Sequence, residues 1–204
     1  MEISIIVLAA GLSTRFGRNK LLEPVGSSTL IEHVVSETMK SKAQQVIVVG
    51  GHDFEKVGQL LGKYGCAIVY NNEFAKGQSF SVRKGISAVD GNADAVMILP
   101  GDILLMNHHI IDSVIDAFVK THAPIISAGY RGSPGHPILF SRELFQELKE
   151  IDEATRGLKK VVSNHMKEAK IVETSPAALF DLDTQQDFER LKTIRSELQQ
   201  HTTD

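Results

Sequence analysis

The stretch from Leu8 to Leu22, LAAGLSTRFGRNKLL, combines small residues with cations in the way that an anion site requires. Small side chains let a ligand approach the main chain closely, and consecutive amides in a tight turn cradle phosphate oxygens. Arg15 offers two parallel donors to a phosphate, and Lys20 adds a compact positive charge. The small residues are Ala9, Ala10 and Gly11. These residue types indicate a phosphate-binding loop.

The spacing of this loop fits neither of the two common phosphate-binding motifs. A Walker A loop reads G-x-x-x-x-G-K-[ST], whereas five residues separate Gly11 from Gly17 and Lys20 comes three residues later. The dinucleotide pattern G-x-G-x-x-G does not occur here either. Spacing therefore leaves open a plain strand-to-helix loop with solvated cations.

A carboxylate suited to a metal ion follows another apolar stretch. Asp102 comes after the run AVMIL and after a glycine, where a buried strand is expected to end. A hard carboxylate that shares its cation with water and phosphate oxygens is a usual protein ligand of Mg²⁺. The alternative is that Asp102 merely caps the helix that follows.

Short apolar runs alternate along the chain with segments of helical period, which predicts strands and helices in turn. Runs that are rich in Ile and Val throughout are typical of parallel strands covered on both faces. We therefore expect an α/β fold, a three-layer α/β/α sandwich around a Rossmann-like, mostly parallel sheet. The phosphate loop would lie at the carboxyl end of the first strand, where such sheets bind ligands. The expected strands are residues 3–8, 45–50, 67–70, 95–99, 124–129, 137–140 and 170–174.

The expected helices carry apolar stripes and capping signals. In the first, the stripe extends to Met39, and Thr29 with Glu32 forms a capping-box pattern. In the last, Thr184 is the expected N-cap. The helices cover residues 29–41, 53–62, 108–120 and 184–198. The residues of the last helix that are expected to face inward are Phe188, Leu191 and Ile194.

Composition places the chain among ordinary globular proteins, because 42% of its 204 residues are hydrophobic and 23% are charged. This length predicts a single domain, residues 1–204, with a polar, frayed tail at 200–204. A net charge of −3 argues against nucleic acid and anionic membranes as partners. The lone cysteine, Cys66, excludes an internal disulfide, and no basic segment precedes the first apolar run, so we expect a cytoplasmic location.

The phosphate loop resembles the signature of the MobA/MocA-like nucleotidyltransferases, LA[AG]G-x-S-x-R-[MF]G-x-x-K. The resemblance implies a nucleotide-diphospho-sugar transferase-like fold, in which this loop wraps the triphosphate of a nucleotide. Family members that use CTP tend to carry alanine at the position of Ala10, and those that use GTP tend to carry glycine. The fixed positions of the signature are matched by Leu8, Ala9, Ala10, Gly11, Ser13, Arg15, Phe16, Gly17 and Lys20.

Two acidic segments resemble the same family. In PGDILLM the resemblance assigns Asp102 to Mg²⁺, although Leu104 stands where the family usually has proline. The segment FDLDTQQDF resembles the family's D-[IL]-D-T-x-x-D-[FLY], and it makes Asp183 the second expected ligand of the metal. The pair of Thr184 and Asp187 in this segment is better interpreted as helix capping.

A segment in the middle of the chain, KGQSFSVRKGI, resembles the family's G-[MQ]-S-x-S-[LIV]-x-x-G. The resemblance implies that this segment begins a helix and contacts the nucleotide. For Ser79, a plain helix N-cap is the structural alternative. The implied contacts are Gly77, Gln78, Ser79 and Ser81.

The segment RGSPGHPILF resembles the family's G-[HN]-P-[VI]-L-F and predicts a rigid turn that enters a strand. His136 would lie at the tip of this turn, and the resemblance assigns His136 and Pro137 to the pocket of the acceptor substrate. Further along, the family usually shows GD-x-GAR, whereas this chain has DEATRGLK at residues 152–159. The acceptor side therefore departs from the family pattern.

Taken together, the matches imply a nucleotidyltransferase that transfers CMP from CTP to the terminal phosphate of molybdenum-bound molybdopterin and releases pyrophosphate, with Mg²⁺ as cofactor. The implied partners are CTP, the molybdenum cofactor and a molybdenum hydroxylase such as xanthine dehydrogenase. Three alternatives stay open: a guanylyltransferase of the same family, a transferase for another phosphate acceptor, and a non-enzymatic maturation factor that binds and delivers the cofactor.

Overall fold

The central sheet is built from the Ile- and Val-rich runs of the sequence. The computed structural model describes residues 1–180, 182 and 184–200, with side chains up to residue 193. Its main sheet has seven strands in the order β5-β4-β1-β6-β8-β7-β9, and all are parallel except β8, which runs antiparallel to both of its neighbours. The mostly parallel sheet is therefore confirmed. The strands are β1 Ile3–Ala9, β4 Gln45–Gly50, β5 Ala67–Tyr70, β6 Ala95–Pro100, β7 Ile125–Tyr130, β8 Ser133–Ser141 and β9 Lys170–Glu173.

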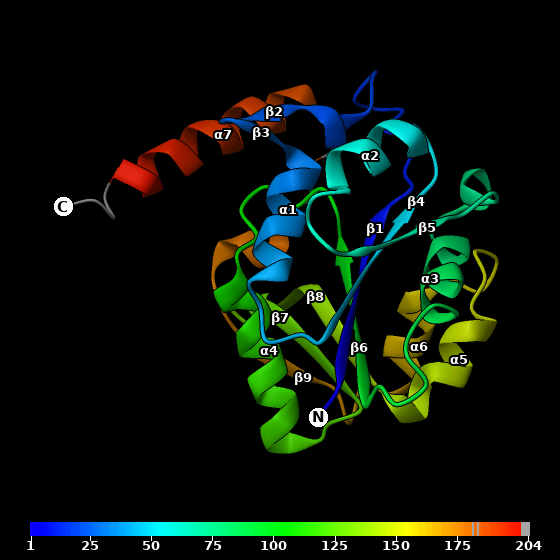
Figure 1. Ribbon diagram of the computed structural model, residues 1–204. Coiled ribbons are helices and arrows are strands. Elements are labelled where there is room, and N and C mark those ends of the chain that lie inside the picture. Colours follow the sequence, from blue (N-terminus) through cyan, green and yellow to red (C-terminus); the bar gives the residue numbers. More distant parts are fainter. Residues whose placement is uncertain (181, 183, 201–204) are drawn as a thin grey trace.

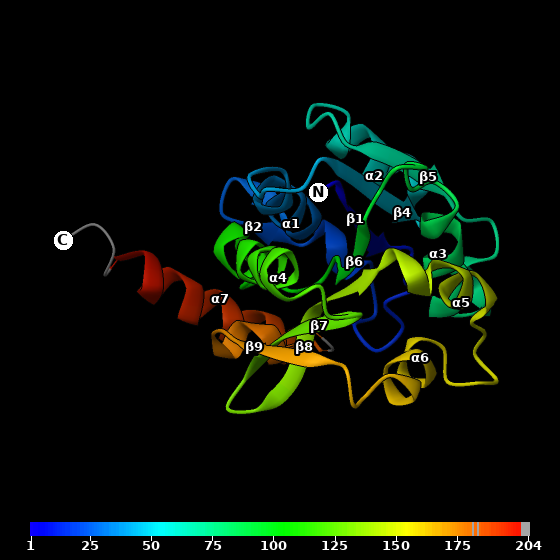
Figure 2. The same ribbon diagram turned by 90° about the horizontal axis from the view of Figure 1, so that it is seen from below.

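Helices cover both faces of this sheet, which confirms the three-layer sandwich (Figures 1 and 2). One face packs against α1 Leu30–Met39, α2 Phe54–Leu61, α4 His108–Thr121 and α7 Gln185–Gln200. The other face packs against α3 Gln78–Ile86, α5 Phe145–Glu150 and α6 Leu158–Asn164. A two-stranded ribbon, β2 Pro24–Val25 and β3 Ser28–Thr29, precedes α1. The short 3-10 helices are η1 Lys20–Leu22, η2 Phe74–Lys76, η3 Arg142–Leu144 and η4 Pro176–Leu179.

The capping signals of the sequence act as expected at two helices. The carboxylate of Glu32 accepts hydrogen bonds from the backbone amide and the hydroxyl of Thr29, both at 2.9 Å, and this capping box starts α1. At α7 the carboxylate of Asp187 accepts from the backbone amide of Thr184 at 2.8 Å, and the Asp187 amide donates to the Thr184 hydroxyl at 3.2 Å. The predicted capping role of Thr184 and Asp187 is confirmed.

Burial agrees with the predicted apolar stripe of α7 but not with the end of the stripe of α1. Phe188 and Leu191 of α7 are buried, as expected, whereas the side chain of Ile194 lies outside the described ones. The predicted extension of the apolar stripe of α1 to Met39 is wrong, because this side chain, at the last residue of the helix, is 40% exposed. Cys66 is half-buried against the core, and burial raises the pKa of its thiol.

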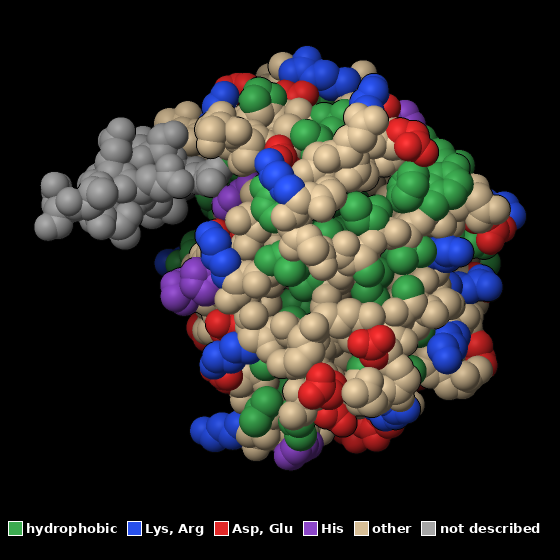
Figure 3. All heavy atoms as spheres, in the orientation of Figure 1, with side chains coloured by type: hydrophobic (Ala, Val, Ile, Leu, Met, Phe, Trp, Pro, Cys, Tyr) green, Lys and Arg blue, Asp and Glu red, His purple; other side chains and the backbone are tan. Residues whose placement is uncertain are grey.

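Charges of both signs occur together on the face of the molecule shown in Figure 3. Basic and acidic side chains are interspersed there, in keeping with the small net charge of −3. Within the described residues, no helix is both long enough and apolar enough to span a membrane.

A partly buried glutamate joins two helices of the same layer. Glu37 of α1 accepts hydrogen bonds from the ring of His108 at 2.9 Å and from its backbone amide at 3.2 Å, at the start of α4. It also accepts from Nζ of Lys40 at 2.6 Å. Burial on its own would raise the pKa of Glu37, but these hydrogen bonds outweigh it and lower the pKa to about 2.

This contact predicts a pH-dependent stability. Because the pKa of Glu37 is lower in the folded chain than its ordinary value of 4.5, its contribution is present above pH 4.5 and is lost as pH falls toward 2. We expect Glu37→Gln to lower the free energy of unfolding at pH 7 by about 1–2 kcal/mol, since the exposed Lys40 is screened by solvent. Urea unfolding at pH 7 and at pH 3 measures the difference. The difference in the free energy of unfolding between Glu37→Gln and the unaltered chain should be smaller at pH 3 than at pH 7. For the exposed control Glu55→Gln, this difference should not depend on pH.

Candidate active site

The loop after β1 is folded back on itself by two left-handed residues. Ser13 has φ 51° and Gly17 has φ 82°, and the amides of Phe16 and Gly17 both donate to the carbonyl of Ser13, at 3.0 and 3.2 Å. The hydroxyl of Ser13 accepts from the amide of Lys20 at 3.3 Å. The turn therefore returns the chain to the end of β1, where η1 begins with Lys20.

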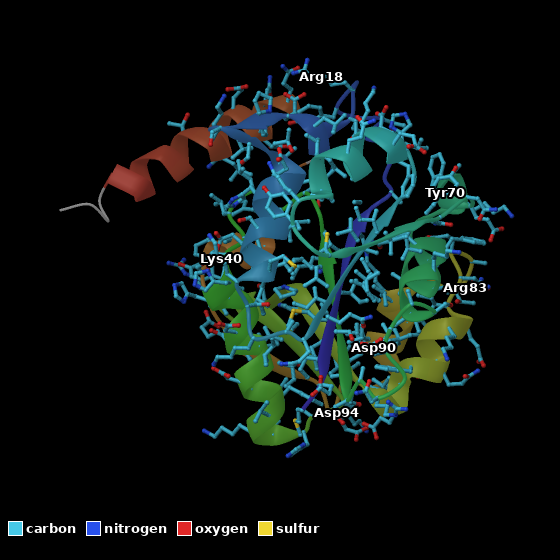
Figure 4. All side chains as sticks on the ribbon, viewed as in Figure 1. Arg18, Lys40, Tyr70, Arg83, Asp90 and Asp94 are labelled. Carbon is cyan, nitrogen blue, oxygen red and sulfur yellow. The ribbon has the colours of Figure 1, made fainter. Side chains whose placement is uncertain are left out.

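A pocket of about 370 Å³ opens at this end of the sheet, beside the carboxyl ends of β1 and β6. Figure 4 shows Arg18 of the loop and Tyr70 at the end of β5 toward this end of the molecule, with Asp90 and Asp94 toward the other. Open α/β sheets bind ligands at this position. Of the predicted site residues, the pocket is lined by Leu8, Ala10, Gly11, Ser13, Arg15, Lys20, Gly77, Gln78, Ser81 and Asp102.

Lys20 and Asp102 meet inside this pocket. Nζ of Lys20 lies 2.5 Å from Oδ2 of Asp102 and donates to the carbonyl oxygen of Leu182, also at 2.5 Å. Both side chains are mostly covered, with exposed fractions of 16% and 19%. The predicted cation and the predicted carboxylate therefore share one site, although they lie 82 residues apart in the sequence.

Asp102 is brought here by a close approach of two strand ends. The amide of Gly101 donates to the carbonyl of Leu8 at 2.9 Å, and a Cβ at Gly101 would lie 2.9 Å from the same oxygen. Asp102 does not cap the next helix, because Asn107 does so by accepting from Ile110 N. The capping alternative for Asp102 is wrong.

The amino end of α3 forms the opposite wall. Gly77, with φ 125°, is the residue before the helix, and Gln78 and Ser81 face the pocket. Ser79 is a buried residue of the second helical position, so the N-cap alternative for it was wrong. The hydroxyl of Ser81 accepts a hydrogen bond from the side-chain amide, Nδ2, of the buried Asn71 at 3.0 Å. The sequence offered no signal for Asn71, since its role depends on a partner ten residues away.

A second pocket, of about 520 Å³, adjoins the first through Gln78, which lines both. Its lining includes Ser79 and the segment that replaces the family's GD-x-GAR pattern. There the carboxylate of Glu153 accepts from the amide of Ser79 at 2.6 Å, and Gly157 lies against the Ser79 hydroxyl. Arg156 and Lys159 supply positive charge to this pocket.

Four predicted site residues lie elsewhere. Ala9 is buried at the end of β1, and Ser79 lines only the second of the two pockets. His136 and Pro137 belong to β8 and are not among the described residues that line either pocket. The expected turn with His136 at its tip was wrong, because the hairpin turns at Arg131 and Gly132 instead.

Two further sequence expectations concern the acidic segments. Asp183 lies outside the described residues, although its neighbour Leu182 contacts Lys20. Leu104, which replaces the family's proline, is fully buried in the core. The leucine therefore packs in the hydrophobic core close to Asp102.

Two solved structures resemble this fold closely. A homologue of Mycobacterium tuberculosis Rv0371c from Mycobacterium sp. strain JC1 superposes with a TM-score of 0.83 at 26% identity, over 96% of this chain and 98% of that one. Rv0371c from M. tuberculosis H37Rv, in complex with manganese, gives a TM-score of 0.80 at 24% identity, over 95% and 99% of the two chains. At the latter identity the likeness shows the fold alone.

Among curated proteins, the bifunctional protein GlmU of Francisella tularensis subsp. novicida (strain U112) is 31% identical over 118 residues. That match covers 57% of this chain and 25% of GlmU, so the chain spans about a quarter of the length of the curated relatives it matches. A family model described as the MobA-like NTP transferase domain matches residues 5–169.

The fold and the loop after β1 together define a nucleotidyltransferase. Within that class, the chain belongs to the MobA-like NTP transferase family. The resemblance seen in the loop signature is thereby confirmed. The matched region includes β1 from Ile5 onward, the loop, α3 and Asp102, and it ends before β9.

Proposed function

We propose that the chain transfers CMP from CTP to the terminal phosphate of molybdenum-bound molybdopterin and releases pyrophosphate, in the maturation of the molybdenum cofactor. The observation that carries this proposal is the meeting of Lys20 with Asp102 in the pocket that Arg15 also lines. The choice of CTP rests on Ala10, at the position where CTP-using family members tend to have alanine.

The residues of the pocket divide between the two halves of the nucleotide. The loop amides at Gly11 and Ser13, with Arg15 and Lys20, neutralise the triphosphate. Across the pocket, the α3 end contacts the nucleoside, with Ser81 oriented by Asn71. Gly77 and Gln78 complete this wall.

The donors beside Lys20 suit a divalent cation. A carboxylate oxygen of Asp102 and the carbonyl oxygen of Leu182 converge on one ammonium group, and hard oxygen donors of this kind are those that Mg²⁺ prefers. Within the described residues, no group of three or more His, Cys, Asp and Glu side chains converges, so phosphate oxygens and water would complete the shell. We propose Asp102 and Asp183 as the protein ligands of Mg²⁺, and Rv0371c has been solved with manganese.

The reaction requires no nucleophilic side chain. An oxygen of the acceptor phosphate forms a bond to the α-phosphorus of CTP, and the bond from that phosphorus to the bridging oxygen of the β-phosphate breaks, so that pyrophosphate leaves with the electron pair. The chain has to bring two anions together. Arg15 and Lys20 offset the repulsion, the pocket walls align the reacting groups, and the bound metal contributes Lewis-acid stabilisation of the phosphates.

Three wider assignments belong to the same proposal. The chain acts as one nucleotidyltransferase domain over residues 1–204, in the cytoplasm, and serves a molybdenum hydroxylase such as xanthine dehydrogenase. His136 and Pro137 remain proposed for the acceptor, although they are not among the described residues that line the two pockets. Arg156 and Lys159, which line the second pocket together with Glu153, support an anionic acceptor there, and Gln78 joins this pocket to the nucleotide pocket.

Nucleotide-dependent thermal stabilisation tests the choice of CTP. In Mg²⁺, CTP should raise the melting temperature more than GTP, ATP or UTP at equal concentration, because a ligand that binds only the folded chain stabilises it by mass action. At 100 times its dissociation constant the expected gain is about 2.7 kcal/mol. A larger shift with GTP would assign the chain to the guanylyl branch.

Ala10→Gly is the matched variant for this measurement. It should narrow the difference between the melting-temperature shifts that CTP and GTP cause. The free chain should melt at a slightly lower temperature, because Ala10 is buried and glycine gains entropy in the unfolded chain. Release of pyrophosphate from CTP in the presence of molybdenum cofactor then separates an enzyme from a carrier. Binding of the cofactor without release of pyrophosphate would support the non-enzymatic maturation factor.

A further inference from the structure

Asn19 joins the phosphate loop to η1, the short helix that carries Lys20. It is buried, with an exposed fraction of 6%, although the preceding Arg18 is exposed. Its Oδ1 accepts from the amide of Leu21 at 3.1 Å and so caps η1. Its Nδ2 donates to Oδ2 of Asp53 at 3.2 Å. Because both ends of the amide are used, the start of η1 is fixed from two sides.

Asp53 accepts a hydrogen bond from Asn19 instead of capping its own helix, α2. It precedes α2 as the N-cap residue, with left-handed φ 54° and ψ 30°. An aspartate at an N-cap usually accepts from the first amides of its own helix, but this side chain makes no such hydrogen bond. Its carboxylate instead faces Asn19 of the phosphate loop.

Two other groups lie beside the same carboxylate. Nζ of the exposed Lys56 lies 2.9 Å from Oδ1 of Asp53, and Nδ1 of His52 lies 3.3 Å from Oδ2 without forming a hydrogen bond. The hydrogen bonds from Lys56 and then from Asn19 outweigh burial and lower the pKa of Asp53. The carboxylate is therefore a charged acceptor for Asn19 at neutral pH.

We propose that Asp53 is a positioning residue of the active site: by holding Asn19 it fixes the start of η1 and thereby the place of Lys20 beside Asp102. Asp53 is not among the described residues that line the nucleotide pocket, so it acts through Asn19. The kinetic consequence rests on the proposed function, whereas the place of Lys20 is measurable without any substrate.

The first experiment observes Lys20 directly in the nucleotide-free chain. Lysines are reductively methylated with ¹³C-formaldehyde, and the Lys20 resonance is assigned with Lys20→Arg. Asp53→Ala should move this resonance toward the position of solvent-exposed lysines. Lys56→Ala is the matched control, because it removes the exposed partner of Asp53 and leaves the contact with Asn19. A Lys20 resonance that is unchanged in Asp53→Ala overturns the proposal.

The second experiment exchanges donor and acceptor. Asn19→Asp alone opposes two carboxylates and should shift the Lys20 resonance as Asp53→Ala does. Asn19→Asp combined with Asp53→Asn should restore it, because one aspartate oxygen still accepts from Leu21 while the other accepts from the exchanged amide. Failure of this double variant to restore the resonance, when it is folded, contradicts the proposal even if Asp53→Ala does not fold.

Kinetics then separate this inference from the proposed function. Asp53→Ala should lower kcat/KM for pyrophosphate release about tenfold. Lys56→Ala should keep the kcat/KM of the unaltered chain, and Asn19→Asp combined with Asp53→Asn should restore it. If the unaltered chain releases no pyrophosphate from any nucleotide, the proposed function fails, while the resonance of Lys20 still decides the role of Asp53. Equal kcat/KM for Asp53→Ala and the unaltered chain, in an active enzyme, overturns the positioning role.

Discussion

Asp102→Ala is expected to lower kcat for pyrophosphate release by about 10³-fold, the loss that follows when charge stabilisation is removed from a phosphoryl-type transfer. The carboxylate faces the pocket at the carboxyl ends of β1 and β6, and it is mostly covered. Because it forms no helix cap, its loss should leave the fold almost as stable as before. Turnover is measured with saturating CTP, Mg²⁺ and molybdenum cofactor as the acceptor, and stability by thermal melting.

The exposed pair of Lys42 and Asp116 supplies the control for this variant. Nζ of Lys42 lies 2.7 Å from Oδ1 of Asp116, and both side chains are more than half exposed, so the pair has the same chemistry outside the pocket. Asp116→Ala should keep the turnover of the unaltered chain. If Asp102→Ala also keeps it, the assignment of Asp102 to the site is wrong.

The sequence predicted the strands well because their burial leaves a local record. Strands β1, β4 and β6 are covered on both faces, and such strands require apolar residues at nearly every position. The capping box at Thr29 and Glu32 is likewise local, since its partners are three residues apart. Signals of this kind are readable without knowledge of the tertiary structure.

The direction of β8 could not be predicted from its own residues. Alternating strands and helices favour parallel pairing, but β7 and β8 are joined by a hairpin without a helix between them. The turn uses Arg131 and Gly132, both in left-handed backbone, and Glu173 accepts from their amides. A two-residue connection ending in glycine is a hairpin signal, whereas the prolines that follow it suggested a later turn. Helices α5 and α6 were missed because each is too short to show a clear period.

The candidate site was predicted where one segment carries its chemistry. The phosphate loop holds its small residues and cations within one stretch, and most of them line the pocket. The contacts of Asn19 with Asp53 and of Asn71 with Ser81 were not predictable in this way. Their polar side chains are ordinary in sequence and gain a role only when two loops meet.

Lys20→Met should change catalysis and metal binding in opposite directions. Without its ammonium group, the triphosphate loses a charge partner, and kcat/KM for CTP should fall by about 10³-fold. In the nucleotide-free chain, however, Nζ of Lys20 lies 2.5 Å from Oδ2 of Asp102 and competes for the carboxylate that we assign to the metal. Removal of this competitor should tighten Mn²⁺ binding about fivefold, as expected for an ion pair worth ~1 kcal/mol.

Electron paramagnetic resonance of free Mn²⁺ measures this affinity directly, and Lys42→Met provides the control in which neither quantity changes. The opposite changes in turnover and in Mn²⁺ affinity distinguish a catalytic site from a purely structural ion pair. If Lys20 only stabilised the loop, its loss would loosen the arrangement around Asp102 and weaken Mn²⁺ binding together with turnover. A weaker Mn²⁺ affinity in Lys20→Met would therefore contradict the assignment of the metal to Asp102, whereas a tighter one, with turnover lost, requires that ammonium and metal use the same carboxylate.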